Sequence, residues 1–224
     1  YALSEGNAVR LLVDGPATYS AMFEALGAAR TRVDLECYMI DDQGPGETLA
    51  QRLTDRRAQG VAVRVLYDSV GSFETPDSFF ARLREAGIEV CEFHPIRPWR
   101  QALGLLDINH RDHRKVMVVD DSVAFVGGVN ISHEYAASYM KLKRAKKVRG
   151  HQGRRDTHLR LRGPAVRWLA EAFEANWRDQ RCDDAARNLQ ALGPARCEDD
   201  ECDATVAIVA ADADRGDAPI RRLL

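Results

Sequence analysis

The chain has 224 residues, of which 45% are hydrophobic and 29% charged, and its formal net charge is −2. This length suits one sizeable α/β domain or two small ones. The weak negative charge excludes a general attraction to nucleic acid or anionic membranes, and no apolar run approaches the roughly 20 residues of a membrane-spanning helix.

Helices and strands are expected to alternate over the first part of the chain. Apolar residues recur at helical spacing in some segments, and short apolar runs of strand type stand between them. Strands are expected at 8–13, 33–40, 61–67 and 88–93, and helices at 17–30, 48–59 and 76–86. This alternation predicts an α/β fold with a mainly parallel sheet and helices on its faces.

Polar residues in and after the second and third of these strands are candidates for a ligand site. Glu36 stands inside an apolar strand, where an acid is costly without a partner, so it lies at a strand edge, near a site, or in a satisfied structural contact. The polar segments 41–46 and 68–72 follow strand ends, which is where ligands bind in open α/β sheets. We interpret 68–72 mainly as a turn, with a contribution to a pocket as the second possibility.

The longest irregular connection runs from His94 to Asp112. It carries Trp99 between prolines, arginines and leucines. Long loops of this kind are commonly binding loops, and Trp and Leu beside arginines suit a lipid surface. Burial of the same side chains over an edge of the core is the alternative.

The most informative stretch runs from Asn109 to Asn130 and reads NHRDHRKVMVVDDSVAFVGGVN. His113 and Lys115 stand at the start of a short apolar run and share one face of the expected strand. Residues 120–122 supply turn chemistry before a second apolar run, so a tight hairpin is expected.

The end of this stretch adds groups that suit phosphate. Gly127 and Gly128 allow the backbone to approach a ligand closely, and Asn130 adds an amide. A neutral imidazole can attack phosphorus, while a lysine and an amide can bind phosphate oxygens. Together these residues predict a phosphodiester site.

The spacing His113-x-Lys115, Asp120, Gly127-Gly128-x-Asn130 resembles the signature of the phospholipase D superfamily. The double glycine, where many members have Gly-Ser, is most similar to bacterial cardiolipin synthases. The resemblance implies a phospholipase D-like α/β/α sandwich with a mixed, mainly parallel central sheet. It also implies a phosphatidyltransferase or phosphodiesterase that works through a phosphohistidine, without a metal or other cofactor.

The resemblance also implies roles for single residues. His113 would be the nucleophile or the acid/base partner, and Lys115 and Asn130 would clamp the phosphate. Gly127 and Gly128 would form the backbone next to it. Asp120 belongs to the catalytic signature but lies past the turn, so we expect it to brace the site structurally.

Three further features follow the signature. A helix at 131–140 should direct its first N–H groups toward the phosphate. Eight cations lie between Lys141 and Arg155, and such a run either binds anionic headgroups or nucleic acid or is a solvated loop. By resemblance, Asp156 would accept a hydrogen bond from His113, and an ordinary surface aspartate is an equal alternative. His158 lies on the same strand face as Asp156, and fewer observations favour a role for it at the site.

We expect residues 1–181 to form one catalytic half. An amphipathic helix starts at Gly163-Pro164, residues 182–203 form an acidic linker, and residues 204–224 would open a second, truncated half. Five cysteines favour a reducing compartment. We expect Cys37 and Cys91 in the core, and the other three as free thiols or one bridge.

The family pattern requires two signatures, and this sequence has one. The second would come from a missing carboxyl-terminal part or from a homodimer. The expected partners are a phosphatidylglycerol-like substrate and an anionic membrane surface, at a cytoplasmic, peripheral location with any anchor outside this chain. A dimeric endonuclease acting on nucleic acid and an inactive half-domain are the alternatives.

Overall fold

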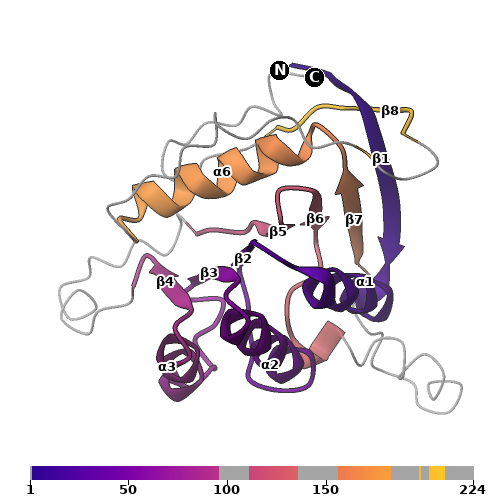
Figure 1. Ribbon diagram of the computed structural model, residues 1–224. Helices are drawn as coiled ribbons and strands as arrows, with labels where there is room; N and C mark the ends of the chain where they lie inside the picture. Colours follow the sequence, from indigo (N-terminus) through magenta and orange to yellow (C-terminus); the bar gives the residue numbers. More distant parts are fainter. Residues whose placement is uncertain (1, 96–110, 136–155, 183–196, 198–201, 210–224) are drawn as a thin grey trace, which may run out of the picture.

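The computed structural model of the protein describes residues 2–95, 111–135, 156–182, 197 and 202–209 (Figure 1). The elements follow one another in the order β1 (Ser4–Val13), α1 (Asp14–Ala28), β2 (Arg32–Cys37), α2 (Pro45–Ala58), β3 (Ala62–Asp68), α3 (Asp77–Glu85), β4 (Glu89–Phe93), β5 (Lys115–Val119), β6 (Val123–Gly127), β7 (Thr157–Arg162), α6 (Val166–Asp179) and β8 (Ala204–Val206). Every helix and strand expected between residues 8 and 93 is present, with ends shifted by a few residues.

The described strands form one mixed sheet in the order β4-β3-β2-β5-β6-β7-β1-β8. The pairs β2–β3 and β3–β4 are parallel, and the five other pairs of described strands are antiparallel. The mixed sheet is confirmed, with a smaller parallel share than the alternation suggested. The reason is that crossover helices connect only β2, β3 and β4, whereas a hairpin joins β5 to β6.

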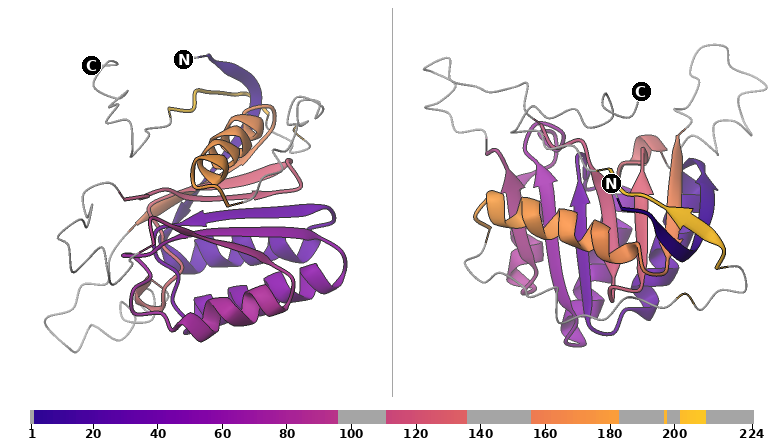
Figure 2. Two further views of the ribbon diagram at one scale, coloured as in Figure 1. Left: turned by 90° about the vertical axis from the view of Figure 1, so that its left-hand side faces the viewer. Right: turned by 90° about the horizontal axis from the view of Figure 1, so that it is seen from above.

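Helices cover both faces of the sheet. Helices α1, α2 and α3 lie on one face and α6 crosses the other, as Figure 2 shows. The alternation along β5 explains this: Met117 packs in the core with α1, α2 and α3, while Val116 and Val118 pack with α6. The expected α/β/α sandwich is therefore confirmed.

The hairpin and the amphipathic helix are present as expected. Val119 pairs with Val123 across the turn, and Asp120 and Asp121 have positive φ angles of 51° and 54°, which Asp tolerates better than most residues. In α6 the apolar residues that recur at helical spacing are all buried, namely Val166, Leu169, Ala170, Phe173 and Trp177.

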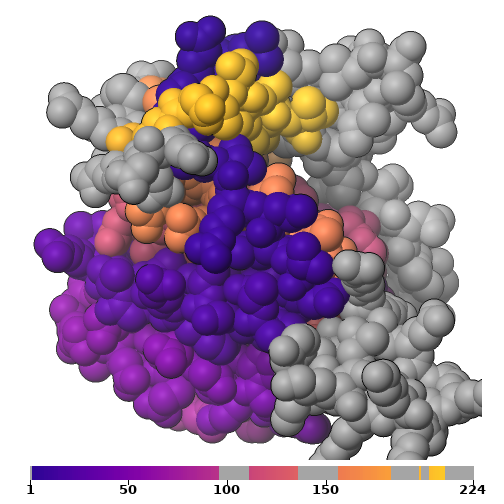
Figure 3. All heavy atoms as spheres, turned by 90° about the vertical axis from the view of Figure 1, so that its right-hand side faces the viewer, coloured from indigo at the N-terminus to yellow at the C-terminus, as the bar shows by residue number. Residues whose placement is uncertain are grey.

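The segment after the linker begins with a strand of the same sheet. β8 pairs with the start of β1 and lies against it at the surface (Figure 3). Residues 210–224 lie outside the described residues, so the division into a linker and a second half stays a prediction.

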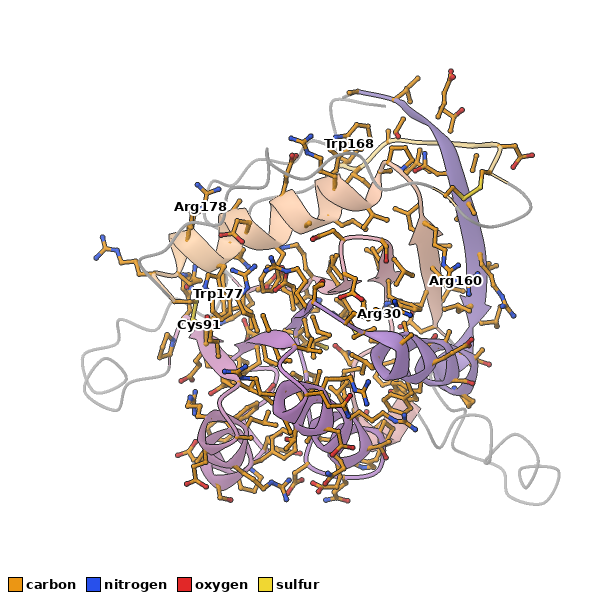
Figure 4. All side chains as sticks on the ribbon, viewed as in Figure 1. Arg30, Cys91, Arg160, Trp168, Trp177 and Arg178 are labelled. Atoms are coloured by element: carbon orange, nitrogen blue, oxygen red, sulfur yellow. A yellow bond between two sulfur atoms is a disulfide. The ribbon has the colours of Figure 1, made fainter. Side chains whose placement is uncertain are left out.

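The cysteine prediction is confirmed for Cys37, which is buried, and for one bridge among the last three cysteines, and it is wrong for Cys91 and Cys182. Cys91 is bonded to Cys182 and Cys197 to Cys202, while Cys37 is a buried free thiol. Figure 4 shows Cys91 beside Trp177, near the carboxyl-terminal end of α6. Cys91 is therefore not a simple core residue, because the sheet edge at β4 meets the end of α6, a contact between segments far apart in sequence.

Two predicted binding segments fall outside the described residues. These are most of the loop with Trp99 and the cationic run up to Arg155. In the part of the chain that the structure does describe, no helix has the length and apolar character needed to cross a bilayer.

Candidate active site

The predicted site residues gather at one edge of the sheet. The carboxyl ends of β2 and β3 meet the start of β5 there, because Cys37 pairs with both Tyr67 and Lys115. The end of β6 and the start of β7 continue the same edge, with Gly127 paired to His158. This is the edge at which ligands were expected.

His113 and Lys115 are adjacent, as their spacing predicted. The His113 side chain is exposed, and its ring lies 4.1 Å from the ring of Tyr38 between centroids. Lys115 is buried, and its Nζ donates a hydrogen bond to the His113 carbonyl oxygen (2.7 Å). The same Nζ lies 5.1 Å from the centre of the Tyr38 ring, a cation–π distance. Tyr38 therefore contacts both groups of the motif.

The surroundings of this pair favour a neutral imidazole beside a cation. Partial burial and the Lys115 charge lower the pKa of His113, while Asp68 and Asp112 oppose that shift. Burial also lowers the pKa of Lys115, and carboxylates including Asp156 counteract it. A neutral ring nitrogen is the form that can attack phosphorus.

Asn130 lies at the same edge, buried and fully engaged. Its side-chain Nδ2 donates to the Tyr135 hydroxyl (3.0 Å), and its backbone carbonyl oxygen accepts from the Tyr19 hydroxyl (2.6 Å). Burial raises the pKa of Tyr19, so this hydroxyl stays protonated and remains a donor. The Asn130 side chain is held in one orientation, and its contact with phosphate stays a prediction.

The expected helix after Asn130 begins at His133, and residues 136–140 lie outside the described residues. The expectation that its first N–H groups point toward a phosphate is wrong for the described residues. The N–H of His133 donates to Asp41 (2.8 Å), and that of Glu134 donates to the Ser132 hydroxyl (3.2 Å). These N–H groups already have protein acceptors, and Ser132 caps the helix.

Both signature glycines lie against β7. A Cβ atom on Gly127 would come within 2.5 Å of the Thr157 carbonyl oxygen and 2.8 Å of Nδ1 of His158. A Cβ on Gly128 would overlap the Asp156 carboxylate. In this structure the glycines therefore leave room for the side chains of His158 and Asp156 at the site edge. Their contact with substrate stays a prediction.

Asp156 lies at the amino end of β7, half-buried over Gly128. Its Oδ1 accepts the N–H of Thr157 (3.0 Å), and its charge opposes the lowering of the Lys115 pKa by burial. Among the described residues no hydrogen bond joins Asp156 to His113, whose ring packs on Tyr38 instead. The predicted hydrogen bond from the His113 imidazole to Asp156 is therefore absent from this arrangement of the described residues.

Asp120 lies at the opposite end of β5 from Lys115. Its carboxylate accepts N–H groups from Arg30, Thr31 and Arg32 at 2.8, 2.8 and 2.9 Å, at the junction between α1 and β2. These hydrogen bonds lower the pKa of Asp120. The structure thus separates Asp120 from the other signature residues and gives it the bracing position that its place after the turn suggested.

Taken together, an exposed imidazole, a buried lysine and a fixed asparagine amide share one sheet edge, which is an arrangement suited to a phosphodiester. The family described as "Cardiolipin synthase, PLD-like domain" matches residues 22–140, which include the motif from His113 to Asn130. The chain belongs to this family. The resemblance seen in the sequence is thereby confirmed.

Curated relatives of this phospholipase D-like chain carry the name cardiolipin synthase A. The protein of Pseudomonas aeruginosa (strain LESB58) is 40% identical over 171 residues, which is 76% of this chain and 32% of the relative. That of Pseudomonas putida (strain GB-1) is 37% identical over 171 residues, which is 33% of the relative. The chain spans about a third of the length of these relatives.

Solved structures support the same fold. The phospholipase D family member Nuc from Salmonella typhimurium superimposes with a TM-score of 0.53 at 17% identity, covering 78% of this chain and 93% of Nuc. NucT from Helicobacter pylori gives a TM-score of 0.52 at 15% identity, covering 79% and 95%. At these identities the likeness concerns the fold alone.

Tyr38 of this phospholipase D-like edge is not singled out by the sequence, because it belongs to an apolar run. Asp68 is expected mainly as a turn residue, with a contribution to a pocket as the second possibility. In the structure Asp68 is buried and its Oδ2 accepts the N–H of Asp112, next to His113 (3.1 Å). The available signal was their position at the carboxyl ends of neighbouring strands.

Proposed function

We propose that this chain is a catalytic half of a phospholipase D-type phosphatidyltransferase that forms a phosphohistidine at His113. The observation that carries the proposal is that the exposed His113 imidazole and the buried Lys115 ammonium both contact the Tyr38 ring. The names of the curated relatives favour phosphatidylglycerol as substrate and cardiolipin as product.

The reaction has two displacements at phosphorus. A ring nitrogen of His113 attacks the phosphodiester, a P–N bond forms, and the P–O bond to glycerol breaks. A general acid protonates the departing oxygen. A hydroxyl of a second phosphatidylglycerol then attacks phosphorus and gives its proton to the same group, now a base, and the P–N bond breaks. Lys115 stabilises the negative charge of both transition states.

The acid/base group has to be supplied from elsewhere. None of the other five histidines of the chain is followed two places later by lysine, so the sequence holds a single motif. A second motif comes either from a further part of a longer protein, as the length of the relatives suggests, or from a second copy of the chain. We therefore expect no sustained turnover by an isolated monomer.

The reaction would take place at a membrane surface, where the lipid is. The chain should partition onto anionic vesicles more than onto neutral ones through its local cationic run from Lys141 to Arg155, because its net charge gives no general attraction. The location on the cytoplasmic side stays a prediction. The two disulfides argue against it, because reducing compartments rarely retain such bonds.

A phosphodiester with a p-nitrophenol leaving group tests the nucleophile without the missing acid, because nitrophenolate departs unprotonated. We expect a burst of about one nitrophenolate per chain, with phosphorus retained in an acid-labile adduct. His113→Ala should abolish both, whereas His133→Asn, at another exposed histidine, should retain them. Full labelling of the His113→Ala variant would refute the assignment.

The same assay distinguishes the rival functions. Labelled phosphatidylglycerol and labelled DNA are offered separately, because the cationic run from Lys141 to Arg155 favours a dimeric endonuclease as the second candidate. An adduct from DNA alone, with steeply salt-dependent binding, would support the nuclease. A strict monomer by sedimentation that gives neither a nitrophenolate burst nor an adduct would support an inactive half-domain.

A further inference from the structure

His113 occupies the corner of a tight turn. Asp112 directly before it is 3% exposed, and its N–H donates to Asp68 Oδ2 (3.1 Å). Its Oδ1 accepts the N–H of Arg114 two residues later (3.1 Å). A side chain that bonds its own backbone two residues on closes such a turn, and the residue in between points outward. The Asp112 carboxylate thus fixes the backbone turn from which the His113 side chain projects.

A second buried acid and an amide hold this carboxylate. Glu36 of β2 is 1% exposed and Asn176 of α6 is 6% exposed. Nδ2 of Asn176 donates to Oε1 of Glu36 (3.0 Å) and to Oδ2 of Asp112 (3.2 Å). Arg114 contacts the same two acids, with its Nε 2.7 Å from Glu36 and 3.2 Å from Asp112. Two carboxyl groups therefore share one amide and one guanidinium.

This arrangement favours one proton on the pair of acids. Burial and the Asp112 charge raise the pKa of Glu36 well above its usual range, against the effect of Arg114. Two other charged side chains lie near Asp112 on neighbouring strands: Asp68 on β3 and Lys115 on β5. The nearby acid of α6, Glu174, is bonded to Arg64 instead. The direction of the Glu36 pKa shift favours the protonated form of Glu36.

We propose that Glu36, Asp112 and Asn176 form a carboxyl clamp that orients the His113 imidazole. Asp112 acts directly through the turn, while Glu36 and Asn176 act through Asp112 as positioning residues. The inference rests on the proposed function only in that His113 is the reacting group. The charges of Asp112 and Asp68 raise the pKa of His113 against the lowering by burial and Lys115, which gives the clamp a measurable effect.

The test compares two buried polar residues of the same helix. Asn176→Leu removes the donor to both acids, whereas Glu174→Gln disturbs the bond to Arg64 (2.8 Å) and leaves the clamp intact. We expect Asn176→Leu to slow the nitrophenolate burst by about 10², the cost of a small misplacement of a reacting group. It should also shift the NMR titration of His113. Glu174→Gln should change neither, even where it lowers stability.

Conservative variants separate the two acids. Glu36→Gln keeps an oxygen acceptor for Asn176 and Arg114, so its burst rate and His113 titration should change less than those of Asp112→Asn. Asp112→Asn keeps the turn but removes the charge, so the pKa of His113 should fall. Equal effects of Asn176→Leu and Glu174→Gln, or a Glu36→Gln variant as impaired as Asp112→Asn, would overturn the clamp. The titration is read without turnover, so it tests the clamp even where no adduct forms.

Discussion

Two histidines of this chain have opposite environments. His113 is exposed at the sheet edge, whereas His158 is 2% exposed within β7 and neither of its ring nitrogens has a hydrogen-bond partner among the described residues. Burial, together with the charge of Lys115, lowers the pKa of His158 to about 4. Its neutral ring lies beside Gly127, where a larger residue would collide with it. One imidazole is thus available for chemistry and the other belongs to the folded interior.

The buried His158 should make stability depend on pH. The folded chain binds no proton at His158 until the pH falls to about 4, whereas the unfolded chain binds one below its ordinary value of 6.5. The unfolded state is therefore favoured as the pH falls through this window, by about 3 kcal/mol in total. Urea denaturation between pH 7 and pH 4 should show this loss, and His158→Leu should remove it.

Leu161→Ala in the same strand is the matched control. It leaves a cavity in the core beneath α6 and should lower the free energy of unfolding by about 2–4 kcal/mol at every pH alike. An equal pH slope in His158→Leu and the unmodified chain would contradict the assignment.

At the scale of elements, α6 connects the site to the far edge of the sheet. It supplies Asn176 to the carboxyl clamp, and Trp177 packs with Phe93 of β4. Just beyond the helix, Cys182 is bonded to Cys91 of β4. The end of the helix is therefore held covalently as well as by packing.

The two disulfides should differ in their effect on stability. Cys91–Cys182 spans 91 residues and Cys197–Cys202 spans 5, so chain entropy predicts contributions of about 4.6 and about 2 kcal/mol. Replacing each pair by serines and measuring unfolding by urea should show the larger loss for Cys91 and Cys182. A larger loss for the short pair, or reduction without effect on either, would disagree with this order.

At the scale of the whole molecule, the site lies where the parallel and antiparallel parts of the sheet meet. β2 pairs in parallel with β3 and antiparallel with β5, and this junction brings Tyr38 next to His113. A buried network joins the same part of the sheet to the layer above it. Arg64 of β3 contacts Asp34 of β2 and Glu174 of α6, both at 2.8 Å.

Arg64→Met should test how strongly this network holds the layers together. It leaves two buried carboxylates without the guanidinium that both contact, which should cost about 3–5 kcal/mol of unfolding free energy. Arg82→Met is the control, because its pair with Glu47 is exposed and should contribute less than about 1 kcal/mol. Similar losses in the two variants would show that Arg64 is not a structural bridge.

Local chemistry made much of this protein predictable from its sequence. The periodicity of the helices, the turn at Asp120 and the shared face of His113 and Lys115 depend on neighbours within a few residues. The sequence by itself therefore determined the α/β class, the hairpin and the family motif.

Contacts between distant segments were decided only by the tertiary structure. The pairing of Cys91 with Cys182, the bridge from Asn176 to Glu36, and the packing of the start of β7 against the two glycines join residues from 28 to 140 positions apart. Their meeting depends on strand order and on which face each helix covers, which local periodicity does not encode. The motif indicated which residues belong to the candidate site, and the packing of the sheet with α6 decided which side chains surround them.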